Sequence, residues 1–200
     1  MTLTIYGPPM SRAMRTLWMA HELGLNFRHE YGFQEEALTP TEDLVAANPM
    51  GQVPAIDDDG FTLSESMAIN IYLAKKHGKL APATPVEEAQ TLRWSFWVMT
   101  AVEVTLLDVL LKARGLRGHE KDPEAAKAGI DTLQKPFNVL NDALAGGDYL
   151  LGNAFTVADL NVASVFAWAR AANIDFSQQP HLDAWLERCL AREAAVWARS

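Results

Sequence analysis

The segment from Asn48 to Ile56, NPMGQVPAI, constrains this chain more than any other part of it. Val53 and Ile56 are typical strand residues, yet Pro54 lies between them. A proline inside a strand removes a hydrogen-bond donor, so it occurs at edges, bulges or cis turns. Because an X-Pro bond adopts the cis form at a cost of about 0.5–1 kcal/mol, we expect a cis turn that presents the Val53 backbone to an extended peptide.

A second candidate site follows at Glu65 and Ser66, where an amphipathic pattern begins that predicts a helix over residues 66–77. The first turn of a helix has free N–H groups, which attract a carboxylate. A backbone edge that binds a peptide and an anion site one hairpin away together indicate a small peptide ligand.

Composition limits the classes of function. The chain has 200 residues, 49% of them hydrophobic and 21% charged, which is enough for one large core or two smaller ones. A net charge of −8 and the lack of a Lys/Arg run predict that no nucleic acid binds. The N-terminal sequence MTLTIY has a strand pattern, and no apolar run approaches the span of a bilayer. We therefore expect a cytoplasmic protein that does not bind membranes.

Cysteine and histidine give little sign of redox or metal chemistry. Cys189 is the only cysteine, which excludes an internal disulfide and a thiolate metal cluster. The five histidines show no paired ligand spacing, so we predict no metal site.

Periodicity and chain breakers divide the chain into two domains. Residues 1–77 carry strand and helix signals in a βαβ-α-ββ-α order, which is that of a thioredoxin-like α/β domain. Residues 78–85 are rich in glycine and proline and are expected to form a linker. Over residues 86–200 the pattern is helical throughout, with helices expected at 86–116, 123–144, 156–172 and 180–190, so an all-α bundle should follow.

The last of the informative motifs, Phe155 to Asp159, predicts a helix start. Thr156 suits the N-cap position, and Asp159 is placed to accept a hydrogen bond from the Thr156 N–H. We expect this motif to serve folding rather than chemistry.

Taken together, the motifs resemble those of the cytosolic glutathione transferases, of the serine type known from bacteria, over the whole chain. The resemblance is carried by four segments: Tyr6 to Ser11 (YGPPMS), Asn48 to Ile56, Glu65-Ser66, and Phe155 to Asp159. It implies the glutathione transferase fold, glutathione as co-substrate, and a homodimer.

The resemblance also implies how the thiol of glutathione is activated. In the pattern that Gly7 to Ser11 resembles, a serine hydroxyl donates a hydrogen bond to the sulfur and stabilises the thiolate, which assigns this role to Ser11. Ser11 also suits an N-cap of the first helix. Tyr6 is the rival donor, because other branches of the family use a tyrosine near the end of the first strand; its other interpretation is core packing.

The resemblance also assigns the residues that bind the remainder of glutathione. Gln52 and the Val53 backbone should hold the cysteinyl part, Pro54 should set the turn, and Glu65 with Ser66 should hold the γ-glutamyl part. Relatives often place a basic residue before the Asn-Pro pair to bind the glycine carboxylate. This chain is acidic there instead, with Glu35, Glu36, Glu42 and Asp43.

The second substrate should meet an apolar wall, which suits an apolar electrophile or an organic hydroperoxide. The candidate lining residues are Met10, Phe33, Trp97, Ala101, Val104 and Trp168. Two hypotheses follow: a glutathione transferase that conjugates the thiolate or uses it to reduce a hydroperoxide, and a non-catalytic protein of the same fold that binds glutathione, an apolar ligand or a protein partner.

Overall fold

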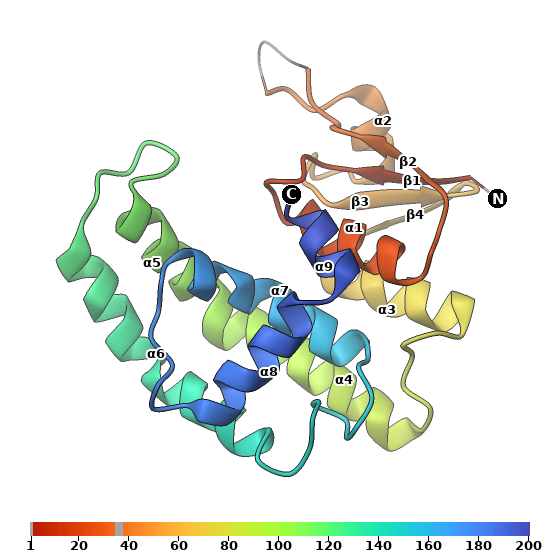
Figure 1. Ribbon diagram of the computed structural model, residues 1–200. Coiled ribbons are helices and arrows are strands. Elements are labelled where there is room, and N and C mark those ends of the chain that lie inside the picture. The colour runs from red at the N-terminus through yellow and green to blue at the C-terminus, as the bar shows by residue number, and fades with distance from the viewer. Residues whose placement is uncertain (1, 35–37) are drawn as a thin grey trace. The chain divides into compact units, whose positions relative to one another are not determined.

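The computed structural model describes residues 2–34 and 38–200 and divides into two compact units (Figure 1). One unit comprises the chain up to Ala81 together with Arg192–Ser200, and the other comprises Pro82–Ala191. Of the acidic residues noted before the Asn-Pro pair, Glu35 and Glu36 lie outside the described residues.

The first unit contains a four-stranded mixed sheet in the order β2-β1-β3-β4. Its strands are β1 (Leu3–Tyr6), β2 (Phe27–Glu30), β3 (Ala55–Asp58) and β4 (Phe61–Ser64). Strand β1 pairs parallel to β2 and antiparallel to β3, and β3 forms a hairpin with β4. Parallel neighbours need a crossover, which helix α1 (Ala13–Glu22) supplies. This arrangement confirms the predicted thioredoxin-like order.

Helices lie on both faces of this sheet, with α1 and α3 (Ser66–His77) on one side and α2 (Glu42–Ala47) on the other (Figure 1). Successive side chains of a strand point to opposite faces. Tyr6 and Ala55, which are paired in the register, pack on the α2 side against Leu44 and Ala47.

The C-terminal helix α9 (Glu193–Ala198) belongs to the first unit, so the predicted assignment of all residues 86–200 to the helical domain is wrong for this segment. The reason is a set of contacts with α1 and β2. The Arg192 guanidinium binds Glu22, and the Trp197 ring lies 4.6 Å from that of His21 and 6.3 Å from that of Phe27. Partners so distant in sequence leave no local pattern.

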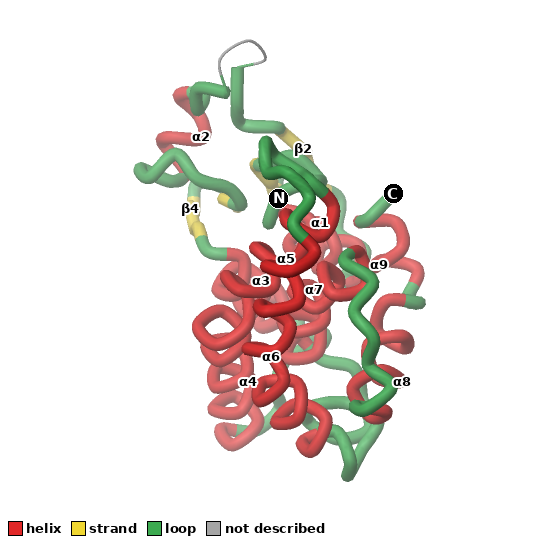
Figure 2. Tube along the Cα trace, turned by 90° about the vertical axis from the view of Figure 1, so that its left-hand side faces the viewer, coloured by secondary structure: helices red, strands yellow, loops and turns green. Residues whose placement is uncertain are grey.

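The second unit is helical, as expected (Figure 2). Its helices are α4 (Pro85–Val98), a π-helical turn η1 (Met99–Glu103), α5 (Val104–Arg114), α6 (Pro123–Ala143), α7 (Val157–Ala171) and α8 (Pro180–Leu190). Helix α7 is buried over most of its length and packs against α4, α5 and α8.

Segment Pro85–Arg114 corrects one expectation. It is a helical stretch of 30 residues that is long and apolar enough to cross a membrane by length and composition, although no such run was expected. Of its most apolar window, 44% is buried inside the structure, and the core helix of a soluble protein has the same properties.

The predicted capping motif is confirmed at the start of α7. Thr156 is the N-cap, and Oδ2 of Asp159 accepts from its N–H at 3.0 Å. The second carboxylate oxygen accepts from the Leu150 N–H at 2.8 Å and from Nε1 of Trp185 at 3.0 Å. Asp159 therefore joins the loop before α7 to α8, while its burial raises the pKa of the carboxyl against the effect of these bonds.

Candidate functional site

The loop between β1 and α1 is built around Gly7. This residue has φ of +133°, and a Cβ atom on it would lie 2.6 Å from Cβ of Ala13 and 2.8 Å from Cβ of Val53. Contacts under 3.0 Å are not tolerated by real Cβ atoms, so only glycine fits. The close approach also shows that the loop, the first residue of α1 and the turn at Val53 are neighbours.

Ser11 lies half-buried at the end of this loop. Its hydroxyl donates to the Pro8 carbonyl at 2.7 Å and accepts from the Ala13 N–H at 3.0 Å. The N-cap of α1 is Arg12, which makes no side-chain cap, so the expected N-cap role of Ser11 is wrong. The Ser11 hydroxyl lies one residue earlier and accepts from the backbone N–H of Ala13, the first residue of the helix. To donate to a sulfur atom, the O–H group must rotate away from Pro8, while the bond from Ala13 can remain. The role of Ser11 towards a thiol stays a prediction.

Tyr6, the rival donor, belongs to the buried cluster with Leu44, Ala47 and Ala55. Its pKa is raised, first by burial and then by the nearby carboxylates of Asp43 and Asp57. A buried phenol among apolar side chains favours the packing interpretation of Tyr6.

The turn before β3 has the predicted geometry, because the Val53–Pro54 peptide bond is cis. Strand β3 begins at Ala55, so Val53 stands just outside the pairing with β1. The turn is held by Asn48, whose amide donates to the Gln52 carbonyl at 2.8 Å and whose Oδ1 accepts from the Met50 N–H at 3.1 Å. The Gln52 side chain is exposed and Pro54 is buried.

Ser66 is the first residue of α3 and is buried, with Glu65 exposed at the N-cap position. Glu65 has φ of +71° and makes no side-chain cap, so it does not occupy the first N–H groups of the helix. Nη1 of Arg15 lies 3.4 Å from Oγ of Ser66, and Arg15 is only 1% exposed.

Sequence reasoning missed this burial of Arg15. The available signal was the position of Arg15 between Met14 and Leu17, on a helix that is buried over most of its length.

The residues expected to line the second-substrate site lie on both units. Met10 is 92% exposed and Phe33 is half-buried in the first unit. In the second unit the candidates are Trp97 on α4, Ala101 in η1, Val104 at the start of α5 and Trp168 on α7. Ala101 and Val104 are exposed, and the two tryptophans are half-buried. A common wall formed by the six residues stays a prediction.

The π-helical turn η1 was not foreseen. It adds one residue to a helical turn, which changes the side chains that share a face, and such turns often occur at functional sites. Its position at Met99–Glu103 includes Ala101 and directly precedes Val104, two of the candidates for the second-substrate site.

Glu42 and Asp43, which make the region before Asn48 acidic, are exposed in the first turn of α2. Thr41 caps this helix, accepting from the Leu44 N–H at 3.2 Å. The two carboxylates are favourably placed at a helix N-terminus, which gives them a structural reason to be there.

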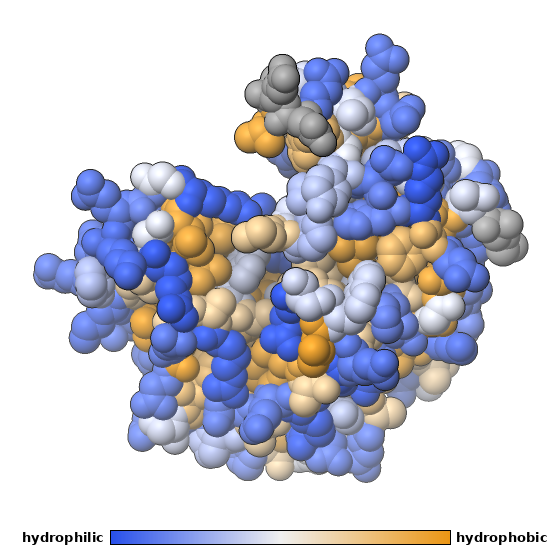
Figure 3. Space-filling model, turned by 45° about the horizontal axis from the view of Figure 1, so that its top comes forward, coloured by the Kyte–Doolittle hydropathy of each residue, from blue (hydrophilic) through white to orange (hydrophobic). Residues whose placement is uncertain are grey.

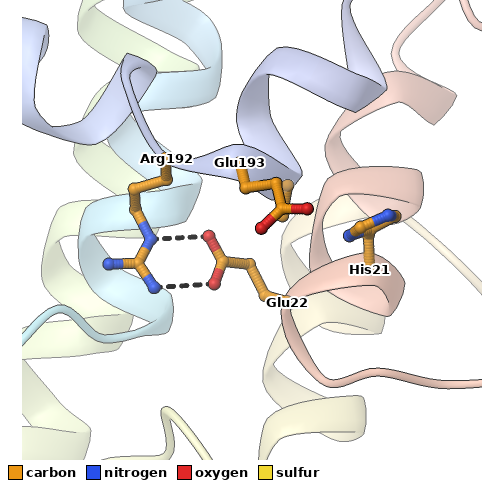
Figure 4. Close-up of a pocket in the computed structure, with 5 residues that line it drawn as sticks. His21, Glu22, Arg192 and Glu193 are labelled. Atoms are coloured by element: carbon orange, nitrogen blue, oxygen red, sulfur yellow. Dashed lines mark hydrogen bonds and ion pairs between the residues drawn. The ribbon is translucent and has the colours of Figure 1, made fainter.

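A separate cavity of about 430 Å³ lies at the C-terminal end of α1 and is lined by His21, Glu22, Arg192, Glu193 and Ala194. Figure 4 shows that the Arg192 guanidinium and the Glu22 carboxylate face each other there through two hydrogen bonds. The Arg192 and Glu22 charges in this cavity therefore have a structural role, because they neutralise each other in an ion pair. Within residues 2–34 and 38–200, no group of three His, Cys, Asp or Glu side chains is arranged to hold a metal ion.

A four-stranded thioredoxin-like unit with a cis-proline turn, together with a helical unit, defines the glutathione transferase fold. Comparison with known proteins agrees. Residues 1–75 match the glutathione S-transferase N-terminal domain family, and residues 95–193 match the C-terminal domain family. The chain therefore belongs to the glutathione S-transferase family.

Individual relatives support the same assignment. Glutathione S-transferase D7 of Drosophila melanogaster is 31% identical over 92% of this chain and 83% of its own length. Glutathione S-transferase 3 of Zea mays is 31% identical over 96% of this chain and 90% of its own. Among solved structures, glutathione S-transferase I from mais, in complex with an atrazine glutathione conjugate, has a TM-score of 0.87 at 25% identity, over 98% of this chain and 96% of that one.

Proposed function

We propose that this protein conjugates glutathione to apolar electrophiles, with the thiol activated as a thiolate by Ser11. The observation that carries the proposal is the clustering of three predicted contacts in the first unit. The Gly7 position touches both Ala13 and Val53, which brings the Ser11 loop next to the cis-proline turn. The bond from Arg15 to Ser66 brings the start of α3 next to α1. In this proposal the Ser11 loop receives the thiol of glutathione, the cis-proline turn receives its cysteinyl backbone, and the start of α3 receives its γ-glutamyl group.

The γ-glutamyl group of glutathione carries a carboxylate and an amino group. The Ser66 hydroxyl and the first N–H groups of the 12-residue helix α3 suit the carboxylate, and the Glu65 carboxylate suits the amino group. The buried guanidinium of Arg15 adds positive charge beside Ser66. The Val53 backbone would pair with the cysteinyl residue as an added strand, with Gln52 beside it.

Ser11 acts in this proposal as a hydrogen-bond donor and not as a nucleophile. A free thiol has a pKa of about 8.5, so little thiolate forms at neutral pH unless the anion is stabilised. The Ala13 N–H donates to the Ser11 oxygen and polarises the hydroxyl, which then donates to the sulfur in place of the Pro8 carbonyl. The thiolate attacks the electrophilic carbon, the carbon–sulfur bond forms, and the leaving group departs with the electron pair.

The same thiolate could attack the terminal oxygen of an organic hydroperoxide. That step releases the alcohol and leaves glutathione sulfenic acid, which a second glutathione converts to the disulfide and water. The chain provides no cysteine for the second step near Ser11, because Cys189 is its only cysteine and is buried. The reductant for this activity is therefore glutathione itself.

The working form in this proposal is a cytoplasmic homodimer. Large apolar side chains stay exposed in the isolated chain, including Met50 at 76% and Phe96 at 67%. Met67 is only 9% exposed and offers little apolar surface for such a contact. On the face shown in Figure 3, hydrophilic side chains predominate, with apolar side chains exposed in patches between them.

The proposal is tested by a spectrophotometric assay with glutathione and a chloronitrobenzene electrophile, beside calorimetric titration with glutathione. We expect saturable binding and turnover that requires glutathione. Binding without turnover across a panel of aryl halides and hydroperoxides would instead select the non-catalytic hypothesis, which the transferase names of the relatives do not favour.

A further inference from the structure

Strand β2 holds the backbone of Gly7 on both sides. The Gly7 N–H donates to the Glu30 carbonyl at 2.8 Å, and the Gly7 carbonyl oxygen lies 2.8 Å from Nε2 of His29. A carbonyl oxygen can only accept, so His29 must carry a proton on Nε2 and donate it. The imidazole is half-buried, and its ring lies 5.6 Å from that of Tyr31. Sequence reasoning singled out neither His29 nor Tyr31.

The carbonyl that His29 binds belongs to the Gly7–Pro8 peptide group. A peptide group is planar, so fixing this oxygen fixes the orientation of the whole group. The proline ring then restricts φ at Pro8, which leaves ψ as the one soft dihedral angle before the Pro8 carbonyl. That carbonyl accepts both the Ser11 N–H at 3.0 Å and the Ser11 hydroxyl at 2.7 Å. The orientation set by His29 therefore reaches Ser11 through a short and stiff path.

The surroundings of Gly7 make this path sensitive to small movements. The Gly7 Cα is packed so closely between Ala13 and Val53 that a Cβ atom would overlap both. A rotation of the Gly7–Pro8 peptide group therefore moves the loop against the start of α1 and the cis-proline turn. Close-packed contacts of this kind transmit displacement instead of absorbing it.

We infer that His29 is a positioning residue for the Ser11 hydroxyl, acting through its Nε2–H bond to the Gly7 carbonyl. The inference rests on the proposed role of Ser11 as the donor to the thiolate. His29 does not need to touch the substrate for this role. Its effect is to keep the loop in the one arrangement that aims the Ser11 hydroxyl at the sulfur.

The test compares a variant that lacks the donor with one that retains it. His29→Leu removes the N–H group, whereas His29→Gln places an amide N–H at a similar distance from the backbone. Misplacement of a catalytic group by about 1 Å can cost up to about 100-fold in rate, so we expect kcat of His29→Leu to fall by about 10- to 100-fold. The pH dependence of kcat/KM and the ultraviolet thiolate absorbance should show a raised thiol pKa. His29→Gln should retain kcat within about threefold and the wild-type thiol pKa.

The matched control is His119→Leu, because His119 is exposed in the loop after α5. A thermal melt of every variant separates loss of fold from loss of position. Wild-type kcat and thiol pKa in a folded His29→Leu would overturn the inference. Equal losses in the Leu and Gln variants would also overturn it, since the donor would then not matter.

A double-mutant cycle with Ser11→Ala separates this inference from the proposed function. If His29 acts through Ser11, then His29→Leu should change kcat by less than about twofold in the Ser11→Ala background. A full further loss in that background would contradict the inference. If Ser11→Ala alone leaves the thiol pKa unchanged, the proposed role of Ser11 fails, whatever His29 does.

A measurement on the unmodified protein complements the variants. Nitrogen NMR of the histidine rings should show His29 as the Nε2–H tautomer with slow exchange of that proton. A neutral His29 with its proton on Nδ1 would contradict the inference without any substitution, since Nε2 could then not donate to Gly7.

Discussion

The Arg192 guanidinium binds the Glu22 carboxylate through two hydrogen bonds, of 2.6 Å from Nε and 2.7 Å from Nη2, across 170 residues of sequence. Nε1 of Trp18 donates to the same carboxylate at 3.0 Å. The Glu22 side chain is only 7% exposed, whereas that of Arg192 is 32% exposed. This pair joins the C-terminal segment to the end of the helix that begins beside Ser11.

The first prediction concerns this pair. Arg192→Ala leaves the Glu22 carboxylate buried without its cation, so the free energy of unfolding should fall by about 1–3 kcal/mol, less than for a fully buried pair because Arg192 is partly exposed. Chemical denaturation measures this loss. Glu193→Gln, at the exposed neighbouring position, is the control and should change stability by less than about 0.5 kcal/mol. Equal stability of Arg192→Ala and the wild type would show that the pair contributes nothing.

The second prediction concerns acid stability at Asp58. Burial alone would raise the pKa of this carboxyl, but hydrogen bonds from Lys76 and Tyr72 outweigh it and hold the pKa below its ordinary value of 3.8. The folded state therefore binds this proton more weakly than the unfolded state does. The resulting stability is fully present above about pH 4 and is lost as the pH falls through the lower folded pKa.

Lys76→Met removes one donor and leaves the burial, so the pKa of Asp58 should rise and the loss of stability should begin at a higher pH. Unfolding free energies measured at a series of pH values from neutral to about pH 3 would show this shift. Lys79→Met, at an exposed position beyond α3, is the control. Identical acid profiles for the two variants would contradict the assignment.

How far sequence predicts this protein depends on the distance over which each feature is encoded. The cis turn at Pro54 and the cap formed by Thr156 and Asp159 were predicted correctly, because each depends on residues within a few positions of one another. Strand β3 begins at Ala55, so Val53, which is a typical strand residue by sequence, stays outside the ladder with β1.

The missed side-chain hydrogen bonds join distant parts of the chain. Arg15 bonds to Ser66 across 51 residues, and His29 bonds to Gly7 across 22 residues. A side chain that donates to a backbone carbonyl in the loop after a neighbouring strand leaves no periodic pattern, since its partner is defined only once the sheet has formed. The π-helical turn was missed for another reason, because one extra residue in a long apolar helix barely alters the pattern of apolar positions.

The third prediction tests the donor role of Ser11. Ser11→Ala should lower kcat much more than it weakens glutathione binding, because the hydroxyl acts on thiol ionisation while the carboxylates are bound elsewhere. The thiol pKa of bound glutathione should rise by about one unit, which is about 1.4 kcal/mol. Steady-state kinetics and a pH titration of the thiolate absorbance measure both effects. A normal pKa in this variant, with a loss in Tyr6→Phe, would transfer the role to Tyr6.

The fourth prediction tests the γ-glutamyl contact. Ser66→Ala removes one hydroxyl that should bind the carboxylate, so glutathione should bind more weakly by about 1–3 kcal/mol. The bond between Arg15 and Ser66 is long, at 3.4 Å, and therefore weak, so the melting temperature should change little. Calorimetric titration and a thermal melt measure the two quantities. Unchanged affinity would mean that Ser66 does not contact the ligand.

The last prediction concerns assembly. Phe96 on α4 is 67% exposed, and such a large aromatic side chain is more typical of the core of an interface than of a free surface. We expect sedimentation to show a homodimer at micromolar concentration and Phe96→Asp to shift it to the monomer, because a charge in an apolar contact is strongly disfavoured. Val139→Asp, at a position on α6 that is 38% exposed, is the matched control and should leave the dimer intact. A wild-type monomer would contradict the dimer, whereas a dimer that survives Phe96→Asp would place the interface away from this face of α4.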